Sequence, residues 1–322
     1  METSLRRVLV TGGCGFVGRE VSSRLMENGY DVVVADNLSN PQSWPKPEFN
    51  FHRLNMEDPA AARMAFTDVD ACIALASHRG AIGYVGRHPT EILTGNSSIY
   101  NATFKAAVEA KVKRLVFISS SMVFESAQDF PTPEERIESI GVPVSFFGFS
   151  KMLGEMYCRS FHQEFGLNYT IIRPSNVYGI NELPEEKVGD SHVIPDLFKK
   201  IVSGQYPVEL LGDGRQTRCF VHVDDIARGI VKAFESTEAE NEDFNVGGTE
   251  EVQILELARM IWDFCGMDKD FEVSHVEGFA QDVNRQFMDV GKAMRLLDWE
   301  PQISFRDGLK EVVEWLKKEY NA

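Results

Sequence analysis

The chain has 322 residues, 43% of them hydrophobic, and its 49 acidic and 33 basic residues give a net charge of −16. This length suffices for one large domain or for two that share an interface, and the apolar content is typical of a globular protein, which excludes a disordered chain. The acidic balance argues against nucleic-acid binding as the main activity, because phosphate neutralisation needs a basic surface. We therefore expect a globular protein with no nucleic-acid partner.

No apolar run approaches the ~18 residues that suggest a membrane span, so no membrane partner is expected. Residues 1–7 lead directly into an apolar strand and a glycine loop, unlike a secretory signal peptide, which predicts a cytoplasmic location. Five cysteines without paired spacing predict reduced thiols and neither a disulfide framework nor a zinc site. They are Cys14, Cys72, Cys158, Cys219 and Cys265.

Short apolar runs alternate with longer helical patterns through the first half of the chain. Runs rich in Val, Ile and Leu predict buried strands at residues 7–11, 31–35, 70–76 and 114–119. The segments between and after them predict helices at residues 16–28, 60–66, 96–110 and 149–165. A further strand, 168–173, ends at Pro174, which cannot continue a central strand. This alternation predicts an α/β fold with a Rossmann-type, doubly wound parallel sheet.

Beyond Pro174 the alternation weakens, and we expect a second, smaller α/β domain there. A polar stretch at 181–191 precedes a predicted helix at 192–203, and residues 217–234 predict a strand and a helix that return to the first domain. The acidic stretch 235–243 is expected to be a solvated loop. The sequence thus predicts two discontinuous domains. The first contains residues 1–174 and about 215–240, and the second contains residues from about 175 to 214 and 241–322.

Residues 11–18 join the first predicted strand to the first predicted helix and contain G-x-x-G-x-x-G through Gly12, Gly15 and Gly18. Glycines let the backbone turn tightly and approach a pyrophosphate, and the following helix N-terminus offers free N–H groups and the positive end of a dipole. The motif is a weak signal by itself, because a structural turn can have the same spacing.

Asp36 follows the second predicted strand, eighteen positions after Gly18. A carboxylate about 20 residues past such a loop accepts hydrogen bonds from the ribose hydroxyls of NAD and repels the 2′-phosphate of NADP. No Arg or Lys occurs between residues 32 and 44 to bind that phosphate. The loop and the acid together predict NAD as the cofactor. The alternative is that Asp36 only caps a turn before Asn37.

Ser119, Ser120 and Ser121 stand at the end of the fourth predicted strand, at the sheet edge where ligands bind in such folds. About thirty residues later, the segment 143–151 opens a helix on which Phe147 and Lys151 lie about one turn apart and share a face. These residues bring a hydroxyl and a cation to the same region.

With these motifs the chain resembles the extended short-chain dehydrogenases, specifically the NAD-dependent epimerase/dehydratase family that acts on nucleotide sugars. That family combines a Ser or Thr with Y-x-x-x-K. The resemblance implies a Rossmann domain, a smaller substrate domain and a homodimer paired through the helices at 96–110 and 149–165. It covers nearly the whole chain through further motifs at residues 173–179, 212–214, 218–225, 245–248 and 297–301.

The resemblance also implies roles for individual residues. Ser120 would hydrogen-bond the sugar hydroxyl that is oxidised, and Lys151 would hold the nicotinamide ribose and lower the pKa of the family's Tyr. The implied cofactor-binding residues are Gly12, Gly15, Phe16, Val17, Gly18, Asp36, Asn37, Asn55, Met56, Leu75, Ala76, Ser77, Asn96, Lys151, Pro174 and Val177. The implied substrate-binding residues are His78, Ser120, Ser121, Asn176, His192, Val193, Arg218 and Arg285, of which Asn176, Arg218 and Arg285 match pyrophosphate-binding positions.

Phe147 occupies the position of the family's catalytic Tyr. A phenyl ring fills the same space but can neither take nor return a proton. Two hypotheses follow: the sequence carries a deliberate Tyr→Phe change that traps unreacted substrate, or the protein works without the phenol. In the second case His78, after the strand at 70–76, is the first candidate for the base. We favour the hypothesis of a deliberate Tyr→Phe change, because Ser120 and Lys151, which would assist the Tyr, are both present.

Ser121 and Met122 follow Ser120, where relatives that dehydrate the sugar carry Asp-Glu. A thioether cannot shuttle protons, so the sequence disfavours 4,6-dehydration, and decarboxylation likewise. The predicted activity is 4-epimerisation through transient oxidation at sugar C4, and a 4-dehydrogenase would need the same residues. From other classes, a non-catalytic NAD and nucleotide-sugar sensor would explain Phe147, and an NADPH reductase of small carbonyls is opposed by Asp36.

Overall fold

The computed structural model describes residues 6–78, 81–187, 189–279 and 282–320. Its centre is a sheet of the order β10-β6-β5-β4-β1-β2-β3, in which all neighbouring strands are parallel. Because the chain runs outward from β1 to β3 and then returns to β4, the strand order reverses beside β1, where open α/β sheets bind ligands. The strands are β1 (Arg7–Thr11), β2 (Asp31–Asp36), β3 (Asn50–Arg53), β4 (Ala71–Ala74), β5 (Arg114–Ile118), β6 (Tyr169–Pro174) and β10 (Glu242–Val246).

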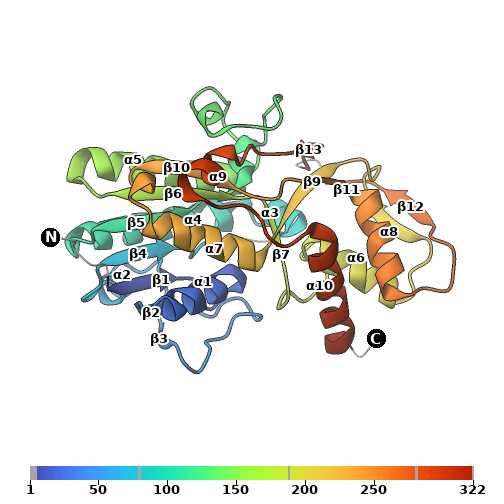
Figure 1. The fold of residues 1–322 in the computed structure, drawn as a ribbon, viewed down its shortest axis with the longest axis horizontal. Coiled ribbons are helices and arrows are strands. Elements are labelled where there is room, and N and C mark those ends of the chain that lie inside the picture. Colours follow the sequence, from blue (N-terminus) through green and yellow to red (C-terminus); the bar gives the residue numbers. More distant parts are fainter. Residues whose placement is uncertain (1–5, 79–80, 188, 280–281, 321–322) are drawn as a thin grey trace.

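Helices cover both faces of this sheet (Figure 1). Apolar side chains such as Val21, Ile230 and Leu297 join one face to α1 (Phe16–Glu27), α7 (Val223–Glu235) and α9 (Gly291–Leu297). The other face packs against α2 (Pro59–Ala65), α4 (Pro89–Glu109) and α5 (Phe146–Phe165), and α3 (Ile82–Arg87) precedes α4. This arrangement confirms the predicted Rossmann-type, doubly wound fold.

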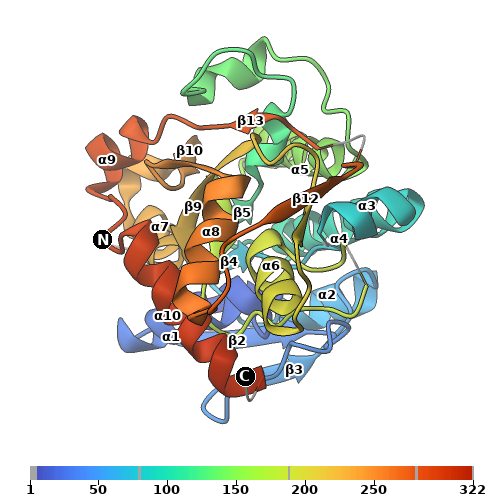
Figure 2. The same cartoon turned by 90° about the vertical axis from the view of Figure 1, so that its right-hand side faces the viewer.

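The remaining elements form a smaller body beside the carboxyl ends of the large sheet, and Figure 2 views the molecule from its side. β9 pairs with three short strands, and β8 pairs with β12. Three helices share an apolar core with these strands. The elements are β7 (Asn176–Tyr178), β8 (Val208–Leu211), β9 (Thr217–His222), β11 (Glu251–Gln253), β12 (Val273–Val276), β13 (Arg285–Gln286), α6 (Val193–Val202), α8 (Ile254–Cys265) and α10 (Phe305–Tyr320).

Two strands lie in a different part of the molecule from the domain to which the sequence assigned them. β9, expected in the first domain, belongs to the smaller sheet, and only the helix after it, α7, packs on α1. β10, expected in the second domain, is the edge strand of the large sheet. The acidic stretch 235–243 is therefore only partly a loop, because it contains a short 3₁₀ helix, η3 (Thr237–Ala239), and the first two residues of β10. The domain boundary is crossed again at β10.

Two other features were not predicted from the sequence. β3 is a short edge strand that exposes most of its side chains, so it lacks the apolar run on which strand prediction depends. Residues 125–145 form a segment that extends away from the rest of the molecule in Figures 1 and 2. It contains the 3₁₀ helix η2 (Glu134–Glu138) and begins just after η1 (Ser121–Phe124). None of the helices in the described residues is long and apolar enough to cross a membrane.

A buried ion network ties β6 to its neighbours. The Arg173 side chain is 0% exposed, and its guanidinium donates to both carboxylate oxygens of Glu155 on α5, at 2.8 and 2.7 Å, and to Asp243 on β10 at 2.6 Å. Burial alone lowers the pKa of Arg173, but the two carboxylates raise it above its ordinary value. Ser119 donates to Glu155 at 2.6 Å, and Lys292 pairs with Asp243 at 3.1 Å. The carboxyl end of β5 is thereby fixed to α5.

We expect Arg173→Met to lower the free energy of unfolding by about 3–5 kcal/mol, because it leaves two buried carboxylates without their cation. Urea titration of the purified protein measures this loss. The matched control is Lys310→Met, which breaks the exposed pair with Glu314 and should change stability by no more than about 0.5 kcal/mol. Equal effects of the two substitutions would show that the network does not hold these elements together.

Candidate active site

The glycine loop between β1 and α1 turns sharply beside β4. Gly12 has φ +69°, and a Cβ there would lie 2.8 Å from the backbone nitrogen of Ala76. A Cβ at Gly18 would lie 2.2 Å from the carbonyl oxygen of Gly12, so both positions require glycine. α1 starts after Gly15 without a side-chain cap. Its first N–H groups therefore face the space beyond the strand ends, a cradle that suits a pyrophosphate.

A first cavity of about 430 Å³ extends from this loop over the end of β2. Asp36 lies in its wall and is 8% exposed, and its carboxylate accepts hydrogen bonds from Cys14 N at 3.1 Å and Leu38 N at 2.8 Å. Asp36 thus holds the turn and also faces the cavity. Other expected cofactor residues in the wall are Gly12, Gly15, Asn37, Asn55, Met56, Leu75, Ala76 and Ser77.

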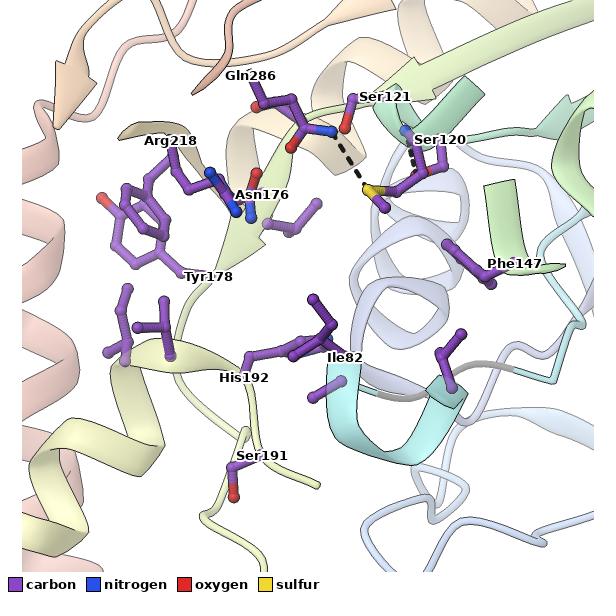
Figure 3. Close-up of a pocket in the computed structure, with 18 of the residues that line it drawn as sticks. Ile82, Ser120, Ser121, Phe147, Asn176, Tyr178, Ser191, His192, Arg218 and Gln286 are labelled. Carbon is purple, nitrogen blue, oxygen red and sulfur yellow. Dashed lines mark hydrogen bonds between the residues drawn. The ribbon is translucent and has the colours of Figure 1, made fainter. Parts of the chain in front are cut away.

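A second cavity of about 420 Å³ begins at the same loop and runs into the smaller body. The two cavities share wall residues, including Gly12, Leu75 and Ser77. In Figure 3, Ser120 and Phe147 lie on one side of the second cavity, and Asn176 and Arg218 lie on the other. Expected residues in its wall are Phe16, Val17, Gly18, Ser120, Ser121, Phe147, Lys151, Asn176, Val177, His192, Val193 and Arg218.

The three expected catalytic residues all line the second cavity. Ser120 precedes η1, and its hydroxyl accepts a 3.2 Å hydrogen bond from the backbone nitrogen of Met122. Lys151 is 5% exposed and donates to the carbonyl oxygen of Ile118 at 2.9 Å. Its ammonium lies 5.7 Å from the centroid of the Phe147 ring. A hydroxyl and a cation thus flank a ring that has no ionisable group.

The far part of the second cavity carries polar groups from the smaller body. Arg218, on β9, donates to Thr217 O at 2.7 Å and pairs with Asp282. Burial lowers the pKa of Arg218 below its ordinary value, although the Asp282 carboxylate offsets part of this effect. His192 pairs through Nδ1 with Glu182, and both line the two cavities. An anionic ligand would meet a cation here.

Four expected site residues lie elsewhere. Arg285 lines neither cavity: its side chain is 48% exposed and binds Glu251 at 2.7 and 2.9 Å. The expected pyrophosphate contact of Arg285 therefore lacks support, because β13 turns this side chain away. Asn96 and Pro174 line neither cavity, and Asn96 instead bonds the backbone of His78 at 2.7 and 3.1 Å. His78 lies in the first cavity, not the second.

Sequence reasoning missed several residues in the wall of the second cavity, among them Ser145, Tyr178, Glu182, Asp282 and Gln286. Ser145 had a local signal, because Ser is a favoured helix N-cap and it directly precedes α5. Asp282 and Gln286 had none, since their position depends on how the smaller body packs. Gln286 donates to the sulfur of Met122 at 3.3 Å (Figure 3), which joins the two bodies across the cavity.

Comparison with known proteins agrees with this geometry. The model of the NAD dependent epimerase/dehydratase family matches residues 8–247. A putative UDP-glucose 4-epimerase of Methanocaldococcus jannaschii is 31% identical over 316 residues, covering 96% of this chain and 98% of the relative. The chain therefore belongs to the NAD dependent epimerase/dehydratase family, and it is an enzyme that uses NAD.

Solved structures show the same fold over almost the whole chain. A UDP-glucose 4-epimerase of Thermotoga maritima, solved with UDP-glucose, superposes with a TM-score of 0.87 at 30% identity, covering 98% of this chain and 99% of that one. A dTDP-glucose 4,6-dehydratase of Streptomyces venezuelae, solved with NAD, gives 0.86 at 27% identity and covers 98% of each chain. The family's fold thus serves more than one reaction.

Replacing Asp36 should separate the two cofactors. We expect Asp36→Ala to weaken NAD binding by roughly ten- to a hundredfold, because each lost charge-assisted hydrogen bond contributes ~1.5–3 kcal/mol, and to weaken NADP binding far less. Titration of the protein with each dinucleotide measures both constants. Asp31→Ala, at the exposed start of the same strand, is the control. Equal losses for NAD and NADP would mean that Asp36 only holds its turn.

Proposed function

We propose that this chain is an NAD-dependent nucleotide-sugar 4-epimerase. The observation that carries the proposal is the pair of joined cavities: the glycine loop and Asp36 line one, and Ser120, Lys151 and Arg218 line the other. Bound NAD would accept and return the hydride at sugar C4. The sugar would lie between Ser120 and Phe147, and its diphosphate would lie toward Asn176 and Arg218.

Each protein group has a definite task in this arrangement. Ser120 would hydrogen-bond the C4 hydroxyl and orient it, and Lys151 would hold the nicotinamide ribose and keep positive charge near the reacting oxygen. The forked guanidinium of Arg218 suits phosphate oxygens. When a diphosphate binds, its oxygens would replace the Asp282 carboxylate as the partner of Arg218. Phe147 shapes the sugar site but cannot move a proton. We therefore propose slow turnover for the chain as it stands.

The wall of the second cavity favours epimerisation over dehydration. Elimination of water across C5 and C6 needs an acid and a base beside the sugar. On the side of the cavity that carries Ser120 and Phe147, none of the described wall residues between Ile118 and Lys151 is a carboxylic acid. The carboxylic acids that line this cavity, Glu182, Asp196, Glu209 and Asp282, come later in the chain, beyond β7. Transient oxidation at C4, rotation of the keto sugar and return of the hydride need no such pair.

We also propose that two copies of the chain pair through α4 and α5. These helices pack together on one face of the large sheet. On α5, Met156 is 42% exposed. An exposed apolar side chain on one helix of this pair suits a four-helix interface between two copies, where it would be removed from water.

Restoring the phenol tests the proposed role of position 147. Phe147→Tyr should raise kcat for interconversion of UDP-glucose and UDP-galactose by about 10²–10⁴-fold with little change in KM, because a phenol beside Lys151 can take and return the C4 proton. Steady-state kinetics of the NAD-loaded protein measure both constants. An inert Phe147→Tyr protein that still binds both ligands would favour a sensor instead.

Two arginines provide a matched test of the diphosphate site. Arg218→Ala should raise KM for the nucleotide sugar by roughly ten- to a hundredfold while NAD stays bound, since it removes a charged hydrogen-bond donor from the second cavity. Arg285→Ala, on the neighbouring strand but outside both cavities, should leave KM within about twofold. Kinetics in the Phe147→Tyr background give both values. Loss of NAD from the Arg218→Ala protein would place Arg218 at the cofactor site.

A further inference from the structure

Ser145 lines the second cavity beside Phe147 and caps the start of α5. Its hydroxyl oxygen accepts a 2.9 Å hydrogen bond from Gly148 N. The same hydroxyl donates to one carboxylate oxygen of Glu125, and Ser145 N donates to the other at 2.7 Å. A single hydroxyl therefore connects the cavity to a carboxylate behind it.

Glu125 is half-buried and lines neither cavity. A Cβ at Gly148 would lie 2.6 Å from the carbonyl oxygen of Met122 and 2.9 Å from a Glu125 oxygen, so glycine lets the start of α5 pack closely against η1 and this carboxylate. Burial raises the pKa of Glu125, while hydrogen bonds from Ser145 and from Val144 N lower it in part. In the described part of the chain, the side-chain hydrogen bonds of Glu125 are to Ser145 and Val144 N.

We propose that Ser145 is a catalytic residue and that Glu125 acts through it, as the proton acceptor that replaces the missing phenol. This inference rests on the proposed 4-epimerase activity. The geometry supports it because Ser145 stands two residues before Phe147 on the same wall, and because η1, which starts at Ser121, packs against α5. The hydroxyl would reach the same reacting oxygen as Ser120.

The proposed step balances without another reactant. The C4–H bond breaks and its electron pair leaves with the hydrogen to oxidised NAD, while the C4–O double bond forms. The hydroxyl proton of the sugar passes to the Ser145 oxygen, and the proton of Ser145 passes to Glu125. Return of the hydride to the opposite face reverses both proton transfers, so Glu125 is ionised again at the end of the cycle.

His78, the base suggested by the sequence alone, is less suited to this step. It lies in the first cavity, with its ring bonded to Glu57 at 2.8 Å and 3.5 Å from Glu91. Its backbone is bonded to Asn96 on α4. These contacts hold the ring away from the wall that carries Ser120 and Phe147.

The test compares Glu125→Gln in two backgrounds, using NAD-loaded protein and UDP-glucose. In the native chain, Glu125→Gln should lower kcat by roughly 10²-fold, since Gln keeps the shape but accepts no proton. In the Phe147→Tyr background it should change kcat by less than about twofold, because the phenol then takes the proton. The matched control is Glu134→Gln, which alters another carboxylate with a pKa raised by burial, bonded to Asn245 N. It should have no effect in either background.

The pH dependence adds a readout that a structural role would not change. Activity of the unsubstituted chain should fall as the pH falls through the raised pKa of Glu125, because the protonated carboxyl can no longer accept a proton. Glu125→Gln should abolish this acidic side of the pH profile. Infrared pH titration of the protein without substrate should show a carboxyl band that protonates above the ordinary range of Glu and is lost in Glu125→Gln. A second variant, Ser145→Ala, should lower kcat as Glu125→Gln does. Ser304→Ala, which removes a hydroxyl that is bonded to the backbone nitrogen of Asp307 and lines neither cavity, should not.

The outcomes separate the two proposals. Equal kcat for the native chain and Glu125→Gln, with an active Phe147→Tyr protein, would overturn the relay and leave the epimerase standing. An infrared band unchanged by Glu125→Gln would also overturn the relay. Failure of every variant to convert the sugar, Phe147→Tyr included, would overturn the proposed function and the relay with it.

Discussion

The site depends on one buried guanidinium. Arg173 on β6 binds Glu155 on α5 and Asp243 on β10, and Glu155 also accepts a hydrogen bond from Ser119 at the end of β5. A buried charge without its partners is very costly, so these elements are held in one relative position. Ser120 follows Ser119, and Lys151 lies one helical turn before Glu155. The positions of Ser120 and Lys151 are thus set by a buried network that reaches the wall of the second cavity at Ser119.

Parallel strands explain why cofactor and substrate sites adjoin. The carboxyl ends of the strands of the large sheet point toward the smaller body. The reversal of strand order beside β1 leaves space for the glycine loop there. Family membership establishes the use of NAD, and Ser120, Lys151 and Phe147 line one wall of the second cavity, where the proposed reaction would take place. The Phe147 ring has no hydroxyl, and this makes the neighbouring Ser145 and Glu125 relevant to the proposed chemistry.

The sequence predicted those parts whose signal is local. The glycine loop, the apolar strands and the spacing of Phe147 and Lys151 depend on neighbours within about 20 residues, and the structure brings these groups together. β10 was missed because Glu242 and Asp243 resemble a solvated loop until Lys292 and Arg173 neutralise them. Arg285 lines neither cavity, since its side chain binds Glu251, and no local pattern in the sequence reveals this contact. Asp282 and Gln286 depend on packing between the two bodies, which no local pattern records.

The most direct test of the central claim follows the hydrogen at sugar C4. UDP-glucose carrying deuterium at C4 should be converted by the NAD-loaded protein to its C4 epimer with the deuterium still at C4, because the hydride returns to the sugar from which it came. Mass spectrometry and NMR of the product locate the label. Loss of the label to solvent, or release of a keto sugar in place of the epimer, would contradict the account.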